Sequence, residues 1–175
     1  MTGSVERPIL FLDVDGPLIP FGPSSSRPQR APVSSSEASS GSGNPLLERL
    51  DPAVGPRLMA LGCDLVWAST WMDDANEAVA PRIGLPQLPV VRWPEVLTDV
   101  GPRGLHWKTR HIVAWAGRRS FIWVDDEIGA MDRLWVSAQH EGQSLLHRVD
   151  PGEALTDHDF AELARWLRCT MPNHP

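Results

Sequence analysis

Short apolar runs alternate along the chain with longer segments in which apolar residues recur every three or four positions. A continuous run of four or five apolar residues is typical of a strand covered on both faces, and the longer spacing is typical of a helix with one buried side. We therefore expect strands over residues 8–12, 64–68, 88–91, 120–124 and 145–149, and helices over 46–61, 71–80, 108–116, 131–140 and 157–168. This alternation predicts a mainly parallel sheet with helices on both faces, a Rossmann-like three-layer α/β/α sandwich.

Residues that favour helix ends mark several of the expected boundaries. Gly62, Pro81 and Gly117 stand where the first three helices should stop, and Thr156 is the expected N-cap of the last helix. The apolar stripe of that last helix consists of Phe160, Leu163, Ala164 and Leu167. In a sheet of this kind, ligands bind at the carboxyl ends of the strands.

One internal segment differs sharply in composition from the rest of the chain. Residues 22–44 consist mainly of Ser, Pro and Gly, and such a segment cannot bury enough apolar area to offset its ordering entropy. We interpret it as a flexible insertion within one domain that spans residues 1–175, because apolar segments resume on both sides and this length suits a single core.

Composition and charge narrow the class of protein. The hydrophobic content of 42% is typical of a soluble globular protein, and no apolar run approaches the roughly 18 residues of a membrane span. The N-terminus has no basic region before its apolar stretch, so we expect no secretory signal peptide there. Cys63 and Cys169 are too few for a disulfide framework, which favours a cytoplasmic location. The net charge of −6 argues against a surface built for nonspecific nucleic-acid binding, although Arg110, Arg118 and Arg119 leave room for a local basic groove.

Polar residues stand at the carboxyl ends of three expected strands. They are Asp13 and Asp15 after the first strand, Ser69 and Thr70 after the second, and Asp125 and Asp126 after the fourth. Parallel strands would bring these ends to one edge of the sheet, where four carboxylates repel one another unless a divalent cation neutralises them. Ligand sets made only of oxygen suit Mg²⁺, so this pattern predicts a magnesium site.

These segments resemble, in order, the four motifs of the haloacid dehalogenase-like (HAD) hydrolase superfamily. ILFLDVDGPL (residues 9–18) is similar to the first motif, in which a hydrophobic strand runs into Asp-x-Asp-Gly, and WVDDE (residues 123–127) is similar to the acidic fourth motif. Ser69 stands where the second motif places Ser or Thr, and Lys108 stands where the third places a basic residue. VWASTWMDDAN (residues 66–76) and WVDDE are also similar to a group of small HAD domains, some of which are linked to RNA repair.

The resemblance implies a catalytic role for four residues. Asp13 would attack phosphorus and form an aspartyl-phosphate, and Asp15 would protonate the leaving oxygen and then deprotonate the attacking water. Ser69 would donate a hydrogen bond to a phosphoryl oxygen, and Lys108 would offset the charge of the nucleophile and the phosphate.

The resemblance also implies how Mg²⁺ would be bound. Asp13, the backbone carbonyl of Asp15 and Asp125 would hold the ion, with Asp126 bound directly or through water. Each assignment has a simpler alternative, because Asp-x-Asp-Gly can be an acidic turn and the acidic residues 125–127 can cap the following helix. A calcium loop is excluded, since Pro17 and Ser24 stand where that loop needs Asp or Asn and Glu.

Alternatives also remain at the second and third motifs. Thr70 with Asp73 resembles a loose capping box, so we interpret Thr70 as an N-cap and Ser69 as the phosphate ligand. Arg103 and Arg110 compete with Lys108 as the basic residue.

Several aromatic residues lie within or beside the motifs. Trp67 and Trp123 lie within apolar strands and are predicted to be core, and Trp71 either packs in the core or lines the site. His106 and His111 have no sequence partner at metal-ligand spacing and stay unassigned.

The segments where HAD enzymes carry cap domains are short or of low complexity in this chain. Residues 22–44 cannot form a folded cap and residues 73–106 are few, so we expect a minimal cap and a large substrate, such as a polynucleotide end or another large phosphoester. The resemblance implies a magnesium-dependent phosphomonoesterase, and the oligomeric state stays unspecified. Two alternatives remain: a phosphotransferase in which an alcohol replaces water, and a catalytically silent HAD-like binding or regulatory module. The second draws some support from Pro17, because many HAD enzymes carry Thr or Val there.

Overall fold

The computed structural model describes residues 6–21, 44–94 and 101–171. Its sheet consists of β1 (Ile9–Leu12), β2 (Asp64–Trp67), β3 (Phe121–Asp125) and β4 (Ser144–Arg148). The strands lie in the order β2-β1-β3-β4, and every pairing between them is parallel. The predicted α/β fold with a parallel sheet is therefore confirmed.

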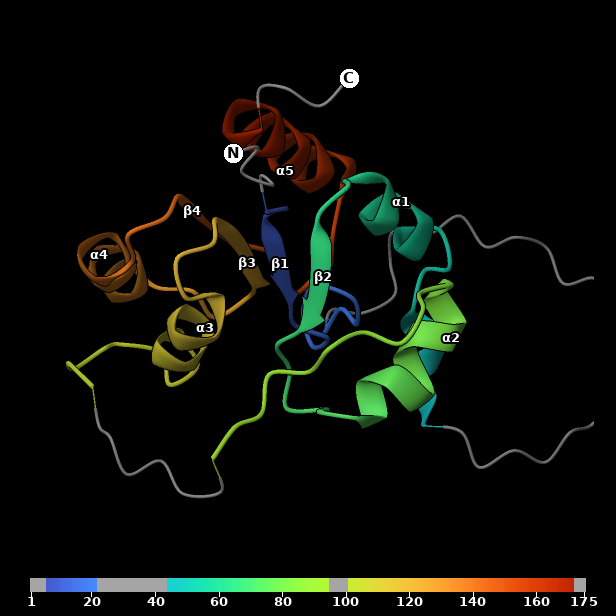
Figure 1. Cartoon of the computed structure of the whole chain (residues 1–175). Coiled ribbons are helices and arrows are strands. Elements are labelled where there is room, and N and C mark those ends of the chain that lie inside the picture. Colours follow the sequence, from blue (N-terminus) through green and yellow to red (C-terminus); the bar gives the residue numbers. More distant parts are fainter. Residues whose placement is uncertain (1–5, 22–43, 95–100, 172–175) are drawn as a thin grey trace, which may run out of the picture.

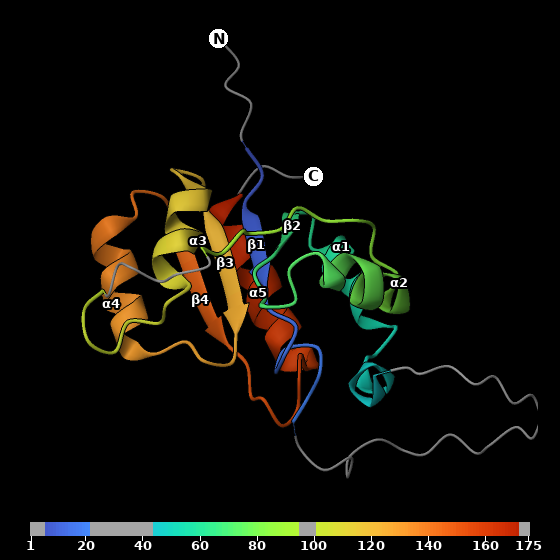
Figure 2. The ribbon, with the colours of Figure 1, turned by 90° about the horizontal axis from the view of Figure 1, so that it is seen from below.

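Helices cover both faces of this sheet, because its central strands are apolar on both sides. Leu10 and Leu12 of β1 belong to a core cluster with α1 (Val54–Ala60), α2 (Ala80–Ile83) and α5 (Asp157–Thr170). Ile9 and Phe11 belong to a second cluster with α3 (Thr109–Ala116) and α4 (Ala130–Gln139). Figures 1 and 2 show α3 and α4 on one side of the strands and α5 and α1 on the other. The result is the expected three-layer sandwich.

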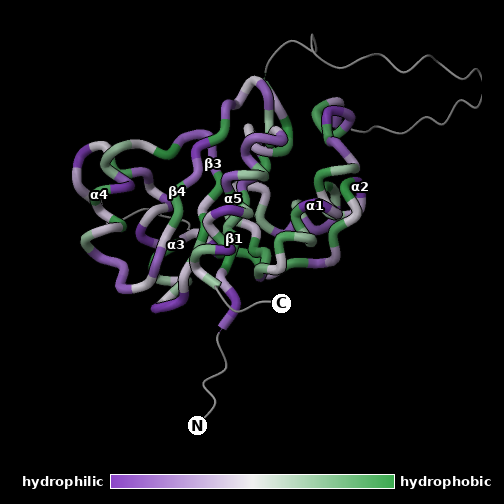
Figure 3. Tube along the Cα trace, turned by 90° about the horizontal axis from the view of Figure 1, so that it is seen from above, coloured by the Kyte–Doolittle hydropathy of each residue, from purple (hydrophilic) through white to green (hydrophobic). Residues whose placement is uncertain are grey.

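Hydrophobic residues concentrate along the central strands, and hydrophilic residues recur along the outer helices α3 and α4 (Figure 3). Trp67 in β2 and Trp123 in β3 are fully buried, which confirms that both belong to the core. Among the described residues, no helix is long and apolar enough to cross a membrane.

The prediction of a single helix over residues 46–61 is wrong. A 3₁₀ helix, η1 (Pro45–Arg49), is followed by an extended Leu50, and α1 starts only at Val54. Pro52 explains the break, since proline has no N–H to donate and disfavours a helical conformation of the residue before it.

The expected helix over residues 71–80 is displaced toward the C-terminus. Residues 70–73 form a turn, Asp74 rather than Thr70 is the N-cap, and a π-helical segment, η2 (Ala75–Val79), leads into α2. Pro81 does not end this helix: it follows the π-helical turn of η2, which runs into α2 without a break. The helix ends instead at Gly84, whose φ of 75° lies in the left-handed region.

The strand expected over residues 88–91 is reduced to one bridge between Trp67 and Val90. Pro89 has no N–H, so it can accept a hydrogen bond from Trp67 N (2.9 Å) but cannot donate to a ladder. Asn76 in η2 holds the segment in place, because its side chain exchanges two hydrogen bonds of 2.8 Å with the backbone of Leu88 and accepts the indole N–H of Trp67 at 2.9 Å.

The other expected helices and strands are confirmed to within two residues. Thr156 is the N-cap of α5 as predicted, since its hydroxyl accepts the N–H of Asp159 (3.4 Å) and the Asp159 carboxylate accepts the N–H of Thr156 (2.7 Å). The predicted flexible insertion lies outside the described residues except for Asn44, which caps η1 by accepting the N–H of Leu46 at 3.1 Å.

Candidate active site

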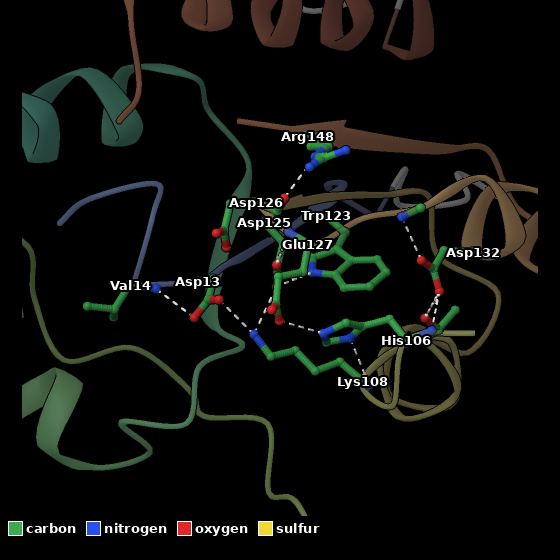
Figure 4. A network of polar contacts seen from close by, with 12 residues as sticks. Asp13, Val14, His106, Lys108, Trp123, Asp125, Asp126, Glu127, Asp132 and Arg148 are labelled. Carbon is green, nitrogen blue, oxygen red and sulfur yellow. Dashed lines mark hydrogen bonds and ion pairs between the residues drawn. The ribbon is translucent and has the colours of Figure 1, made fainter. Parts of the chain in front are cut away.

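Three segments that are distant in the sequence meet at the carboxyl ends of β1 and β3. Asp13 follows β1, Asp125 is the last residue of β3, and Lys108 is the N-cap of α3. The ammonium of Lys108 lies 2.7 Å from Asp13 Oδ2 and 2.8 Å from Asp125 Oδ2, so it bridges the two carboxylates (Figure 4). All three side chains are buried: the residues are 6%, 0% and 3% exposed for Asp13, Asp125 and Lys108. Lys108 is thus the basic candidate that the fold brings to the acidic residues.

Burial dominates the electrostatics of this group. It raises the pKa of Asp13 to about 7, and the neighbouring Asp125 adds to that effect, whereas Lys108 and the Ser69 hydroxyl lower the pKa. Burial also acts to lower the pKa of Lys108, but Asp13 and Asp125 outweigh it and the pKa is raised. Burial and Asp125 raise the pKa of Asp126. The site therefore holds more negative charge than Lys108 compensates.

The excess charge and the donor atoms suit a divalent cation. Asp13, Asp125 and Asp126 offer carboxylate oxygens within 4.8 Å of one another. Three carboxylates and one ammonium leave a formal charge of −2, which one divalent ion balances, and hard oxygen donors are the ligands that Mg²⁺ prefers. The Asp15 carboxylate does not belong to this group, and the resemblance assigns it only a backbone ligand.

His106, Asp125 and Glu127 form a second group with metal-ligand spacing. The sequence spacing gave His106 no such partner, since both carboxylates come from the end of β3 and the loop after it and reach His106 only through the fold. His106 Nε2 lies 3.0 Å from Glu127 Oε2, and His106 Nδ1 accepts the backbone N–H of Lys108 at 3.2 Å. His106 thus ties the Lys108 backbone to the fourth motif.

The loop after β1 approaches the fourth motif very closely. Gly16 has a φ of +86°, and a Cβ placed on it would lie 2.6 Å from Asp126 Cγ. Its N–H donates to Ile19 O at 3.0 Å, and the Pro17 carbonyl accepts the N–H of Leu155 at 2.9 Å. Pro17 therefore lies in a turn that its missing N–H does not disrupt. The close approach to Asp126 requires a glycine at position 16.

The turn after β2 carries the two candidate residues of the second motif. Ser69 is fully buried and its hydroxyl lowers the pKa of Asp13, whereas Thr70 is exposed. The N–H of Trp71 donates to Ser69 Oγ at 3.3 Å, and its indole Nε1 donates to Asp15 Oδ2 at 3.0 Å. Ser69, and not Thr70, therefore joins Asp13.

Two residues that support the site were not predicted from the sequence to do so. Asp132 is buried at the start of α4, where Oδ1 accepts the N–H of His106 (2.8 Å) and the hydroxyl of Thr109 (2.6 Å). Trp123, predicted only as core, also donates its indole N–H to Asp125 Oδ2 at 3.3 Å. The position of Asp132 in the first turn of a helix was the one available signal, and it does not distinguish an anchor from an ordinary capping residue.

A family model of the HAD domain in Swiss Army Knife RNA repair proteins matches residues 9–160, which include every site residue named above. The chain belongs to this family. Its parallel sheet between two layers of helices is therefore that of a HAD domain, and the family supports a hydrolase or phosphatase-like activity in general terms. No curated protein and no solved structure matches the chain.

Proposed function

We propose that this HAD domain is a magnesium-dependent phosphomonoesterase that uses Asp13 as its nucleophile and acts on a phosphorylated RNA end. The observation that carries the proposal is the buried Lys108 ammonium between Asp13 and Asp125, at 2.7 and 2.8 Å. A buried charge cluster of this kind is costly to maintain and is common at functional sites.

In the first step, a carboxylate oxygen of Asp13 attacks phosphorus, and the bond between phosphorus and the leaving oxygen breaks. Asp15 supplies a proton to that oxygen, so the product leaves as an alcohol. The hydroxyl of Ser69 and the ammonium of Lys108 stabilise the charge on the phosphoryl oxygens, since the ammonium lies 2.7 Å from Asp13 and the buried hydroxyl lowers the pKa of that residue.

In the second step, Asp15 takes a proton from water, and the water oxygen attacks phosphorus. The bond between phosphorus and Asp13 breaks, which releases inorganic phosphate and restores the Asp13 carboxylate. Asp15 therefore alternates between acid and base, while Asp13 alternates between free and phosphorylated forms.

Asp13, Asp125 and Asp126 are the carboxylates that would hold the magnesium ion. When bound, the ion neutralises the charge of the phosphoryl oxygens and orients the phosphate toward the nucleophile. Asp125 is already oriented for this role, because Oδ1 accepts the N–H of Glu127 at 3.0 Å and Oδ2 accepts Lys108 at 2.8 Å.

Two observations favour a nucleic-acid end as the substrate. The family consists of HAD domains in RNA repair proteins. Arg148, at the end of β4, is exposed and donates its Nε to the carbonyl of Asp126 at 2.8 Å, which places a guanidinium beside the fourth motif (Figure 4). A guanidinium there suits a contact with the phosphodiester next to the terminal phosphate.

The test is release of phosphate by the purified protein, with Mg²⁺ and with EDTA, from p-nitrophenyl phosphate and from RNA oligonucleotides phosphorylated at either end. We expect magnesium-dependent release that Asp13→Asn abolishes. Arg148→Ala should lower kcat/KM for the oligonucleotide but not for p-nitrophenyl phosphate. Arg165→Ala is the control, because Arg165 lies on α5 in an exposed ion pair with Glu162 and does not belong to the candidate basic groove.

The outcomes separate the alternatives. Equal activity in Asp13→Asn would exclude Asp13 as the nucleophile. Binding of RNA without release from any substrate would favour a silent binding module, and transfer of the phosphoryl group to an added alcohol in preference to water would identify a phosphotransferase.

A further inference from the structure

We infer that Trp71 is the positioning residue for Asp15, and that its indole N–H fixes which carboxylate oxygen carries the catalytic proton. This inference rests on the proposed function, since it concerns the acid and base of the same reaction. Trp71 Nε1 donates to Asp15 Oδ2 at 3.0 Å. Within residues 6–21, 44–94 and 101–171, no other hydrogen bond to the Asp15 carboxylate is present.

The chemistry of the donor decides what this contact does. An indole N–H donates and cannot accept, so it always occupies a lone pair of the oxygen that it contacts. In a protonated carboxyl group, the carbonyl-type oxygen is the better acceptor. The contact at Oδ2 therefore directs the proton to Oδ1, and Oδ1 becomes the atom that gives the proton to the leaving oxygen and later takes one from water.

Trp71 is itself held by its surroundings. The indole packs against the core cluster that contains Leu12 and Trp67. The backbone N–H of Trp71 donates to Ser69 Oγ at 3.3 Å, and its carbonyl accepts the N–H of Asp74 at 3.0 Å. These contacts hold the indole ring in one orientation. The hydrogen bond from its N–H therefore fixes the orientation of the Asp15 carboxylate.

The turn that carries Trp71 also has an unusual backbone. Met72 has a φ of 50°, a left-handed conformation that residues with a side chain rarely adopt. Such residues persist where the surrounding structure requires them and are frequent at functional sites. Through this turn, the phosphate ligand Ser69 and the donor Trp71 keep a constant separation, which couples the position of the phosphate to that of the acid.

The experiment compares two substrates that differ in their need for an acid. An alkyl phosphate has a strongly basic leaving oxygen that must be protonated, whereas p-nitrophenyl phosphate has a leaving group that departs without full protonation. We use kcat/KM, because it reports only the steps up to loss of the leaving group and is insensitive to the later hydrolysis of the aspartyl-phosphate.

Trp71→Phe keeps an aromatic ring but removes the donor. We expect it to lower kcat/KM for the alkyl phosphate by about 10- to 100-fold, a part of the whole effect of a general acid, and for p-nitrophenyl phosphate by less than about threefold. In an Asp15→Asn background, Trp71→Phe should have almost no further effect on the alkyl phosphate, because the two residues act as a unit.

Two more variants separate hydrogen bonding from packing. The imidazole of Trp71→His places Nε2 where the indole has Nε1, so this variant should recover part of the activity on the alkyl phosphate even though it packs less well. Trp166→Phe is the matched control, because Trp166 is also partly buried against the same core cluster and lies on α5, away from the motifs. Trp166→Phe should leave kcat/KM unchanged for both substrates.

The results distinguish this inference from the function on which it rests. A wild-type protein without Asp13-dependent turnover would overturn both. Asp13-dependent turnover that Trp71→Phe lowers equally for the two substrates, with no recovery in Trp71→His, would overturn the inference alone and leave Trp71 a packing residue. Should Trp71→Phe fail to fold, the comparison of Trp71→His with the wild type on the two substrates makes the same distinction.

Discussion

Replacing Lys108 with methionine removes the ammonium group that bridges Asp13 and Asp125 while keeping a side chain of similar length. The two carboxylates are buried and would then face each other without a cation. Removing one partner of a buried ion pair costs about 3–5 kcal/mol of folding free energy. The size of the loss should depend on pH, because Asp13 can take up a proton instead of staying charged.

The direction of that dependence follows from the pKa of Asp13. Burial raises this pKa from 3.8 to about 7, so the contribution of Asp13 to stability is present at low pH and falls as the pH rises toward about 7. Lys108 lowers this pKa, so in Lys108→Met it rises above 7 and the fall in stability continues into the alkaline range. At about 1.4 kcal/mol per pH unit, the extra loss between pH 7 and about pH 8.5 is about 2 kcal/mol.

The assay is guanidinium denaturation of the metal-free proteins in EDTA at about pH 5.5 and about pH 8.5. We expect Lys108→Met to lose about 3–5 kcal/mol at the higher pH and about 2 kcal/mol less at the lower pH. Arg118→Met, which breaks an ion pair with an 86% exposed arginine, should change stability by less than about 0.5 kcal/mol. A loss in Lys108→Met that is equal at both pH values would refute the account of the Asp13 charge.

Three further predictions concern the same site. Gly16→Ala should lower stability by about 1–3 kcal/mol and weaken Mg²⁺ binding in calorimetry, because its Cβ would meet Asp126. Gly62→Ala is the control, since Gly62 has a similar φ but a Cβ there would have no atom within 4 Å. Equal losses of stability in the two variants would contradict the contact with Asp126. Mg²⁺ at about 100 times its Kd should stabilise the protein by about 2.7 kcal/mol above pH 7. The gain should shrink below that pH as Asp13 takes up its proton, and a gain independent of pH would exclude Asp13 as a ligand. Asp132→Asn should lower kcat by about tenfold, because it weakens the contacts that position the start of α3, where Lys108 lies. An unchanged kcat would show that Lys108 is held in some other way.

The sheet and its acidic edge could be predicted from local patterns. The runs ILFL, DLVW and FIWVD are each long enough for a buried strand, and each leads into polar residues, so parallel pairing alone brings Asp13, Ser69 and Asp125 together. The prolines were harder to interpret. Pro52 interrupts a periodic helical segment and Pro81 does not, because the effect of a proline depends on the turn that precedes it.

The contacts that complete the site lie beyond local patterns. Lys108 and Asp13 are 95 residues apart, and Trp71 and Asp15 are 56 apart, so neither contact has a signal in spacing. Motif order could place Lys108 before a helix, but only the packing of α3 against β3 and β1 shows that its side chain reaches both carboxylates. The same applies to Asp132, whose partners become neighbours when α3 and α4 pack together.

The most direct test of the central claim is detection of the phosphoryl group on Asp13. The protein would be mixed with Mg²⁺ and p-nitrophenyl phosphate, quenched in acid within the first turnovers, and treated with borohydride, which reduces an aspartyl-phosphate to homoserine. Peptide mass spectrometry should find homoserine at position 13 in the wild type and neither there nor at Asp15 in Asp13→Asn. Turnover with an unmodified Asp13, or with the modification at another carboxylate, would contradict the account.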